Sequence, residues 1–159
     1  RYHERIEDHA GRDTWYLDAA SCGGGCIADN GPNVFDTLHV ALGSLRVESV
    51  SVRRGETGID MGAEILLSTR RGLPVTVELS WDYDGGEQKD LVITYSDGST
   101  ATVDLLQGSV GFKTSLYHEY EGVLRDLARS IHGIPEDGSI GVDAVRLVRD
   151  CYELAGKGV

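Results

Sequence analysis

The sequence predicts an α+β domain in which a mostly antiparallel open sheet of about five or six strands carries helices on one face. Three observations predict this fold: one helical pattern precedes the strands, short hairpin turns join the strands, and two helical patterns follow them. Strands that are grouped together, rather than alternating with helices, are typical of this class. A chain of 159 residues is long enough for one compact core, so we expect residues 1–159 to form a single domain.

Helical periodicity is present in three segments. Apolar residues recur at three- and four-residue steps over about 32–42, where Pro32 suits a first turn and Gly43 suits a helix end. The first helix could also start earlier, near Ala28. The same spacing predicts two closing helices over about 116–131 and 142–155.

Alternating apolar and polar residues predict the strands between these helices. The pattern is clearest over 75–83, which implies one covered and one wet face. We expect turns at Asp84-Gly85-Gly86 and at Asp97-Gly98, whereas residues 1–14 show no period and are expected to be a helix remnant or a loop. The other strand patterns cover residues 47–52, 61–69, 91–95 and 101–105.

Composition excludes several classes of partner. Lys and Arg number 15 against 26 Asp and Glu, which gives a net charge of −11 and a pI near 4.7. Such a chain is poorly suited to phosphate backbones and anionic membranes, so we expect neither a nucleic-acid nor a membrane partner. No apolar run approaches the roughly 20 residues of a membrane span, and no signal peptide is visible. Three cysteines, an odd number, favour a reducing, cytoplasmic compartment.

Cysteine spacing does not predict a metal site. Cys22 and Cys26 lie four residues apart across three glycines, whereas zinc sites usually combine closer pairs with a second ligand pair. We therefore expect no metal and two small, partly buried thiols. A low-pKa thiol at the helix entry stays open. A metal hydrolase that uses Cys22, Cys26 and Asp29 is the weakest alternative.

The glycine-rich segment before the first helix formally matches a dinucleotide fingerprint, as Gly23-x-Gly25-x-x-Ala28. That motif needs a buried strand directly before it, and the preceding residues 18–22 do not form such a pattern. A glycine-rich loop that enters a helix is therefore the simpler interpretation.

Polar residues at the heads of two helices are candidates for ligand contact. Asp29 and Asn33 lie four residues apart, which places both on one helix face. Taken alone, Asp29 is more simply a helix cap or a first-turn acid. Tyr117 and His118 begin the 116–131 helix and could reach a ligand, although a solvated helix shoulder is the simpler interpretation.

The segment from Trp15 to Gly43 resembles the signature of the C-terminal domain of the Gfo/Idh/MocA oxidoreductases. That signature runs Trp-x-x-Asp, a triple-glycine loop, Asp-x-Gly-x-His, a further Asp and a closing Leu-Gly. The strand meander and the closing helices are similar too. The matching residues here are Trp15, Asp18, Gly23, Gly24, Gly25, Asp29, Gly31, Asn33, Asp36, Leu42 and Gly43.

The resemblance implies the substrate-binding and oligomerisation half of an NAD(P)-dependent enzyme that acts on a sugar, a polyol or a related alcohol or ketone. An N-terminal Rossmann domain, absent from these residues, would hold NAD or NADP, so the isolated chain is expected to be inactive. The partners implied are a small-molecule substrate and further copies of the chain, bound through the open sheet face.

Carried over by position, the resemblance gives Asp29 and Asn33 the catalytic positions. Asp29 would orient or tune the acid–base group. The family's His falls on Asn33, which can orient a hydroxyl but cannot act as a general base because an amide does not titrate near neutral pH. We expect Trp15 and Tyr16 to border the substrate pocket, with Tyr117 and His118 at the second helix head as further substrate contacts. The loop of Gly23, Gly24 and Gly25 would allow close approach to the ligand or cofactor.

The change from His to Asn at residue 33 leaves a second hypothesis open. The chain would then be a stand-alone, non-catalytic module that kept the sheet and binds a small polar ligand or assembles with a partner.

Overall fold

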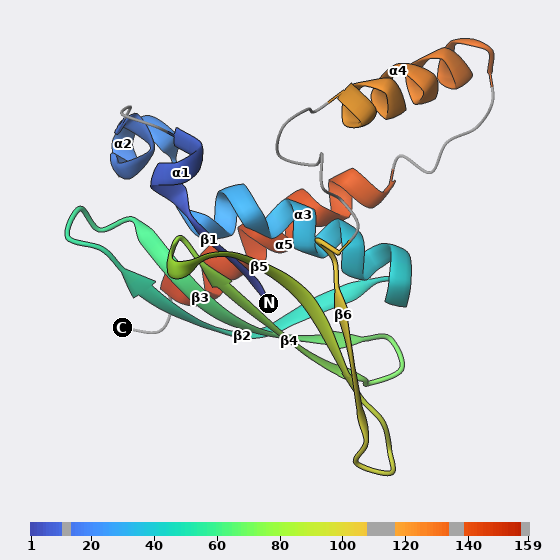
Figure 1. Ribbon diagram of the computed structural model, residues 1–159, viewed down its shortest axis with the longest axis horizontal. Helices are drawn as coiled ribbons and strands as arrows, with labels where there is room; N and C mark the ends of the chain where they lie inside the picture. The colour runs from blue at the N-terminus through green and yellow to red at the C-terminus, as the bar shows by residue number, and fades with distance from the viewer. Residues whose placement is uncertain (11–13, 108–116, 134–138, 157–159) are drawn as a thin grey trace. The chain divides into compact units, whose positions relative to one another are not determined.

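The computed structural model describes residues 1–10, 14–107, 117–133 and 139–156. Within these residues six strands form one sheet in the order β2-β3-β4-β1-β5-β6, which confirms the α+β class (Figure 1). The strands are β1 (Tyr2–Arg5), β2 (Leu45–Arg54), β3 (Asp60–Thr69), β4 (Pro74–Ser80), β5 (Asp82–Thr94) and β6 (Thr100–Asp104). The helices are α1 (Ile6–Ala10), the 3₁₀ turn η1 (Trp15–Leu17), α2 (Ala19–Cys22), α3 (Cys26–Leu42), α4 (Tyr117–Ile131) and α5 (Ser139–Gly156).

The sheet is mostly antiparallel, as expected, and its one parallel pair among the described strands is β1 with β4. β1 lies between β4 and β5, with Tyr2 opposite Leu79 on one side and Lys89 on the other. The expectation of a helix remnant or loop at residues 1–14 is therefore wrong for the first four structured residues. A strand of four residues is too short to show a period, and its pairing comes from residues far along the chain.

The expected turn at Asp84-Gly85-Gly86 is a bulge within β5. Asp82 pairs with Arg5, but the next paired residue of β5 is Glu87, which lies opposite Glu4. The residues between them are extra on that strand, and Gly86 has a φ of 84°, which favours glycine. Trp81 separates β4 from β5, so the clearest predicted strand ends at Ser80.

Helix α3 begins earlier than its sequence pattern indicates. It starts at Cys26, so Pro32 lies inside the helix instead of in its first turn. Gly43 ends it as expected, with a φ of 78°. The early start depends on a carboxylate from β3, described below, that local sequence does not reveal.

Helices α3 and α5 lie on the same face of the sheet (Figure 1). Phe35 and Leu147 are fully buried there, together with Ile65, Leu67 and Val77 of the strands. The opposite face, called the open face below, carries the exposed Glu64, Leu66, Thr76 and Glu78. The alternation in β4 therefore separates a covered and a wet face, as predicted.

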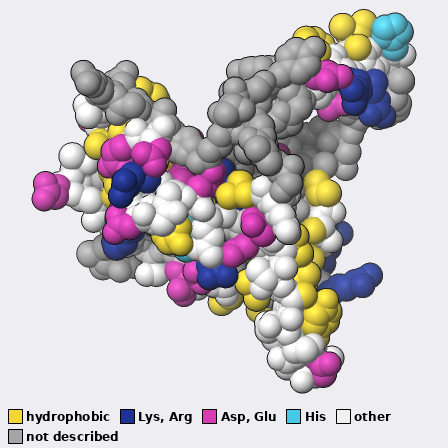
Figure 2. All heavy atoms as spheres, in the orientation of Figure 1, with side chains coloured by type: hydrophobic (Ala, Val, Ile, Leu, Met, Phe, Trp, Pro, Cys, Tyr) yellow, Lys and Arg dark blue, Asp and Glu magenta, His cyan; other side chains and the backbone are white. Residues whose placement is uncertain are grey.

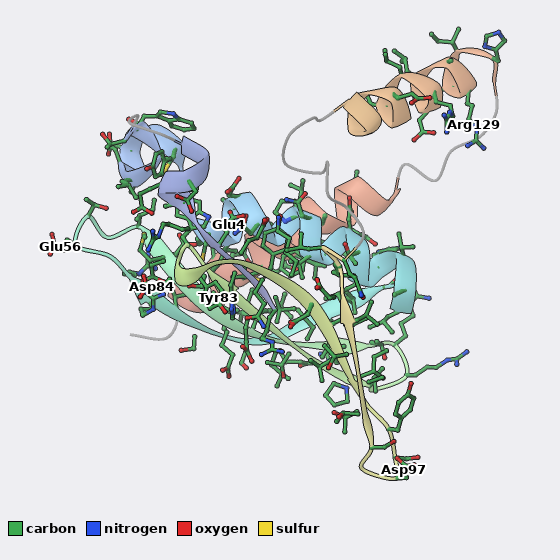
Figure 3. All side chains as sticks on the ribbon, in the orientation of Figure 1. Glu4, Glu56, Tyr83, Asp84, Asp97 and Arg129 are labelled. Carbon is green, nitrogen blue, oxygen red and sulfur yellow. The ribbon has the colours of Figure 1, made fainter. Side chains whose placement is uncertain are left out.

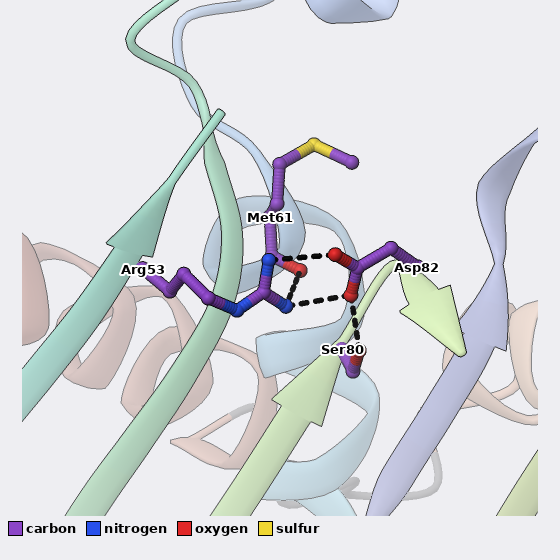
Figure 4. A network of polar contacts seen from close by, with 4 residues as sticks. All are labelled: Arg53, Met61, Ser80 and Asp82. Atoms are coloured by element: carbon purple, nitrogen blue, oxygen red, sulfur yellow. Dashed lines mark hydrogen bonds and ion pairs between the residues drawn. The ribbon is translucent and has the colours of Figure 1, made fainter. Parts of the chain in front are cut away.

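A polar network crosses the open face (Figure 4). Both terminal nitrogens of Arg53 on β2 donate to the carboxylate of Asp82 at 2.6 Å, and the Ser80 hydroxyl donates to the same carboxylate at 2.8 Å. Gly62 of β3 lies underneath, where an added Cβ would come within 2.6 Å of the Arg53 guanidinium. The absence of a side chain at Gly62 lets Arg53 lie flat across β3.

The chain divides into two compact units, Arg1–Lys89 with Ile140–Val159, and Asp90–Ser139. The second unit includes the β5–β6 hairpin, whose Asp97-Gly98 turn is confirmed and whose tip is marked by Asp97 (Figure 3). Hydrophobic side chains are visible along this hairpin (Figure 2). The exposed apolar residues of the hairpin are Val92, Ile93, Tyr95, Val103 and Leu105, and those of α4 are Val123, Leu124, Leu127 and Ile131.

Helices long and apolar enough to cross a bilayer are not found among the described residues.

Candidate functional site

The triple-glycine segment joins α2 to α3, and an aspartate side chain caps the start of each of these helices. At α2, the Asp18 carboxylate accepts from the Ala20 N–H at 3.0 Å and from the Ser21 hydroxyl at 2.6 Å. These bonds, the Ser21 bond most of all, lower the pKa of Asp18. Gly23 then ends α2 with a left-handed φ of 74°. Asp18 of the Trp-x-x-Asp pattern is therefore a helix cap.

At α3, the cap comes from a distant strand. The Asp60 carboxylate, at the start of β3, accepts from the backbone N–H groups of Gly25 and Ile27, each at 2.8 Å. The Tyr152 hydroxyl of α5 donates to both Asp60 oxygens, at 3.0 and 3.1 Å. Asp60 is 1% exposed, so this carboxylate is buried but fully hydrogen-bonded. Burial and the charge of Asp60 raise the pKa of Tyr152.

This arrangement explains two of the three glycines. A Cβ on Gly25 would lie 2.1 Å from the carbonyl oxygen of Asp60, and a Cβ on Gly24 would lie 2.5 Å from the Tyr152 hydroxyl. A side chain fits at neither position without movement of its neighbours. The close approach made possible here is between α3, β3 and α5.

The start of α3 does not fit a dinucleotide phosphate. Free N–H groups at a helix start bind phosphate well, but here the N–H groups of Gly25 and Ile27 already donate to Asp60. A phosphate would have to displace a buried group of the same charge. Contact of Gly23, Gly24 and Gly25 with a cofactor stays a prediction. Such a contact would be along the loop and not at the N–H groups of the helix start.

The two predicted catalytic residues lie on the outer side of α3. Asp29 is in its first turn, Asn33 follows one turn later, and both side chains are exposed. The Asn33 carbonyl accepts from the Thr37 hydroxyl at 2.8 Å. The helix thus presents a carboxylate and an amide side by side to whatever faces it.

The predicted substrate contacts have different surroundings. Trp15 is 57% exposed, whereas Tyr16 is 6% exposed and packs edge-on against Trp81 with ring centroids 6.2 Å apart. Tyr16 therefore has little surface left for a ligand. Tyr117 and His118 begin α4, and their side chains lie outside the described ones.

The cysteines are buried or half-buried thiols, as expected. Cys26 and Cys151 are fully buried, and Cys22 is half-buried. Burial, then the nearby charge of Asp60, raises the pKa of Cys26. Burial raises the pKa of Cys151 to about 12. The raised pKa argues against a low-pKa thiol at Cys26, the first residue of α3. In the described part of the chain, His, Cys, Asp and Glu do not gather into a metal-binding group.

Sequence analysis missed a buried charged cluster on the covered face of β1 and β5. Lys89 lies 2.5 Å from the Glu87 carboxylate, 3.9 Å from that of Glu4 and 4.2 Å from the centre of the Tyr2 ring. Burial lowers the pKa of Lys89, but its bonds to Glu87 and Tyr2 outweigh this and raise it. Figure 3 marks Glu4 on β1. The cluster could have been found only from the pairing of β1 with β5, which places Tyr2 opposite Lys89 and Glu4 opposite Glu87.

A shallow pocket of about 420 Å³ is lined by acidic residues and one arginine, and it contains none of the predicted site residues. Its lining residues are Arg5, Glu7, Asp8, Asp82 and Asp84.

Comparison with known proteins identifies the family. The profile described as GFO/IDH/MocA C-terminal domain matches residues 1–101, so this chain belongs to that family. No curated protein matches the chain.

Solved structures share the fold at low identity. A structure of GenD2 from gentamicin A biosynthesis, in complex with NAD, has a TM-score of 0.74 and 20% identity, and the match covers 99% of this chain and 52% of that one. D-galactose-1-dehydrogenase from Rhizobium etli has a TM-score of 0.68 and 17% identity, over 96% of this chain and 50% of that one. Levoglucosan dehydrogenase, in complex with NADH and levoglucosan, has a TM-score of 0.70 and 13% identity, and the match covers 98% of this chain and 55% of that one. The chain therefore spans about half the length of these structures.

Proposed function

We propose that this chain is the substrate-binding and oligomerisation part of an NAD(P)-dependent oxidoreductase that acts on a sugar, a polyol or a related alcohol or ketone. The observation that carries the proposal is the pair Asp29 and Asn33, which occupies two positions of the family motif and lies exposed, one turn apart, on α3. Membership of the family supports it. We propose that NAD or NADP is held mainly by a separate dinucleotide-binding domain, because the start of α3 is closed by Asp60.

The proposed chemistry divides between the chain and the cofactor. The dinucleotide, when bound, supplies the acceptor or donor of hydride. A hydroxyl that is oxidised must also lose its proton, which requires a base within hydrogen-bond reach. Asp29 would orient or tune that base from α3. Asn33 would hold the same hydroxyl through its amide, without taking the proton.

The test uses the protein that joins this chain to a dinucleotide-binding domain. Formation of NAD(P)H is followed with a panel of sugars and polyols, for the unchanged protein and for Asp29→Asn. We expect Asp29→Asn to lower turnover by roughly a hundredfold, the usual scale for loss of acid–base assistance. The control is Asp126→Asn, an exposed helical carboxylate of α4, which should leave turnover unchanged. Full turnover in Asp29→Asn would remove Asp29 from the mechanism.

Asn33 favours a second candidate function, a non-catalytic module that binds a small polar ligand or assembles with a partner. In that case the chain alone should bind one of the same sugars, and supplying the dinucleotide-binding domain should give no turnover. Turnover with any member of the panel would exclude it.

We further propose that copies of the chain associate through the open face, and that the protein works in the cytoplasm. The first proposal is supported by the open face itself, which neither α3 nor α5 covers and which includes the exposed Leu66. The free thiols Cys22, Cys26 and Cys151 support the second.

A further inference from the structure

The helix that carries Asp29 and Asn33 has no cap of its own. Its N-cap residue is Gly25, which has no side chain to accept from the N–H groups of the first turn. Asp60 replaces the missing cap, accepting from Gly25 and Ile27 although it lies 35 and 33 residues away. The first residue of α3 is thus set by a residue of the sheet.

Three elements meet at this carboxylate. Asp60 belongs to β3, the two N–H donors belong to the start of α3, and the third donor, Tyr152, belongs to α5. The Gly25 N–H also donates to the Tyr152 oxygen at 3.2 Å. Because Asp60 is 1% exposed, water does not substitute for these donors, and each bond is stronger than it would be at the surface.

The position of the helix start decides where the later side chains point. Successive residues of an α-helix are rotated by about 100°, so a helix that starts one residue later, or unwinds by one residue, turns its outer face away. Asp29 is only two residues beyond Ile27, within the capped turn. We propose that Asp60, supported by Tyr152, is a positioning residue that fixes the rotation of α3 and so directs Asp29 and Asn33 at the substrate. This inference rests on the proposed function.

Asp60→Asn is the direct test. An amide has one acceptor oxygen and an NH2 group, so it cannot accept from Gly25, Ile27 and Tyr152 together. In the protein joined to its dinucleotide-binding domain, we expect kcat to fall by roughly tenfold or more, with KM changed by less than about threefold. Hydrogen exchange at the Gly25 and Ile27 amides should become faster. Leu67→Ala, a core change in the same strand, is the stability control and should leave kcat unchanged below its melting temperature.

A double variant separates positioning from general damage. If Asp60 acts by positioning α3, Asp60→Asn should lower kcat much less in the Asp29→Asn background than in the unchanged protein, because the contribution of Asp29 is already lost there and only that of Asn33 remains. The inference would be overturned if the fold-decrease in kcat of the double variant equalled the product of the two single decreases. It would also be overturned if Asp60→Asn had the kcat of the unchanged protein. If Asp60→Asn does not fold, Tyr152→Phe provides a milder variant, because it leaves the Gly25 and Ile27 N–H bonds to Asp60 in place. We expect it to lower kcat by a smaller factor. No turnover in the unchanged protein would instead refute the proposed function, and full turnover in Asp29→Asn would remove Asp29 from the mechanism; both are read from proteins in which Asp60 is intact.

Discussion

Arg53 of β2 and Asp82, the first residue of β5, are joined by two hydrogen bonds of 2.6 Å that pass over Gly62 of β3. A bidentate arginine–carboxylate pair is geometrically specific, and here it spans a neighbouring strand. Burial raises the pKa of Asp82, but the bonds from Arg53 and Ser80 outweigh it, so the pKa of Asp82 lies below its ordinary value.

This pair predicts a dependence of stability on pH. The folded pKa of Asp82 lies below the unfolded value of about 3.9, so the stabilisation is present above that value and is lost as pH falls through the folded pKa. Arg53→Met should lower the free energy of unfolding by about 1 kcal/mol or less at neutral pH, because both partners are half-exposed. It should also flatten the acid side of the plot of this free energy against pH. Urea unfolding at a series of pH values measures both.

Arg54→Met is the matched control for this experiment. Arg54 donates to the neutral carbonyl of Gly58, so its replacement should leave the acid side of the stability curve unchanged. A curve for Arg53→Met that is parallel to that of the unchanged chain would contradict the prediction.

The three glycines before α3 should differ sharply when each is changed to alanine. Gly25→Ala places a Cβ 2.1 Å from a backbone oxygen and should cost about 3 kcal/mol or more. Gly23→Ala meets no neighbour and should cost only about 1–2 kcal/mol, for its left-handed φ. Gly24→Ala should fall between them, since the Tyr152 hydroxyl can move. Thermal unfolding of the three variants gives the order, and an equal cost at all three positions would contradict it.

The triple-glycine segment also shows the limit of sequence analysis. Its glycines were recognisable as a place of close approach, but the partners, Asp60 and Tyr152, lie 35 and 127 residues from Gly25. Asp60 begins a strand, where an acidic residue is more simply interpreted as part of the preceding turn. Local patterns carry no information about such a pairing, so the cap could not be predicted, and an earlier start of α3 was expected only as an alternative.

The thiols should react with a disulfide reagent at very different rates. Burial raises the pKa of Cys26 and of Cys151, so neither forms a thiolate readily, and both are shielded. Half-buried Cys22 should react first in the native protein. Cys22→Ser should abolish the fast phase while leaving two thiols that react only after denaturation. A fast phase that persists in Cys22→Ser would show that a buried thiol is accessible.

Association through the open face can be tested with charge. Leu66 lies on that face and is 38% exposed, so Leu66→Glu should convert an oligomer to a monomer by placing a carboxylate at the contact. Leu73, in the connection between β3 and β4, is 51% exposed and provides the control, because Leu73→Glu adds the same charge away from the strands. Mass in solution at micromolar concentration measures the outcome. A monomer before any substitution would contradict the proposal.

Most of the fold followed from periodicity alone. The alternation over residues 75–83 and the Asp97-Gly98 turn predicted β4 and the hairpin, because one face of each strand is covered and the other is wet. The helical stripe of α5 was equally visible. The prediction failed for the polar strand β1, whose buried Glu4 lies opposite Glu87 of β5 and 3.9 Å from the Lys89 ammonium. From sequence alone, a charged residue is expected at the surface unless the partner that allows its burial is known.

The place of β1 has a consequence for how this protein is made. The ribosome releases Tyr2 long before Leu79 and Lys89, the residues that flank it in the finished sheet. Contacts between residues this distant in sequence slow folding, since the entropy of closing the intervening loop must be lost before they form. Until β1 inserts, β4 and β5 each expose a bare strand edge that can capture another nascent chain. We therefore expect that the yield of native protein depends more on these four polar residues than on any helix.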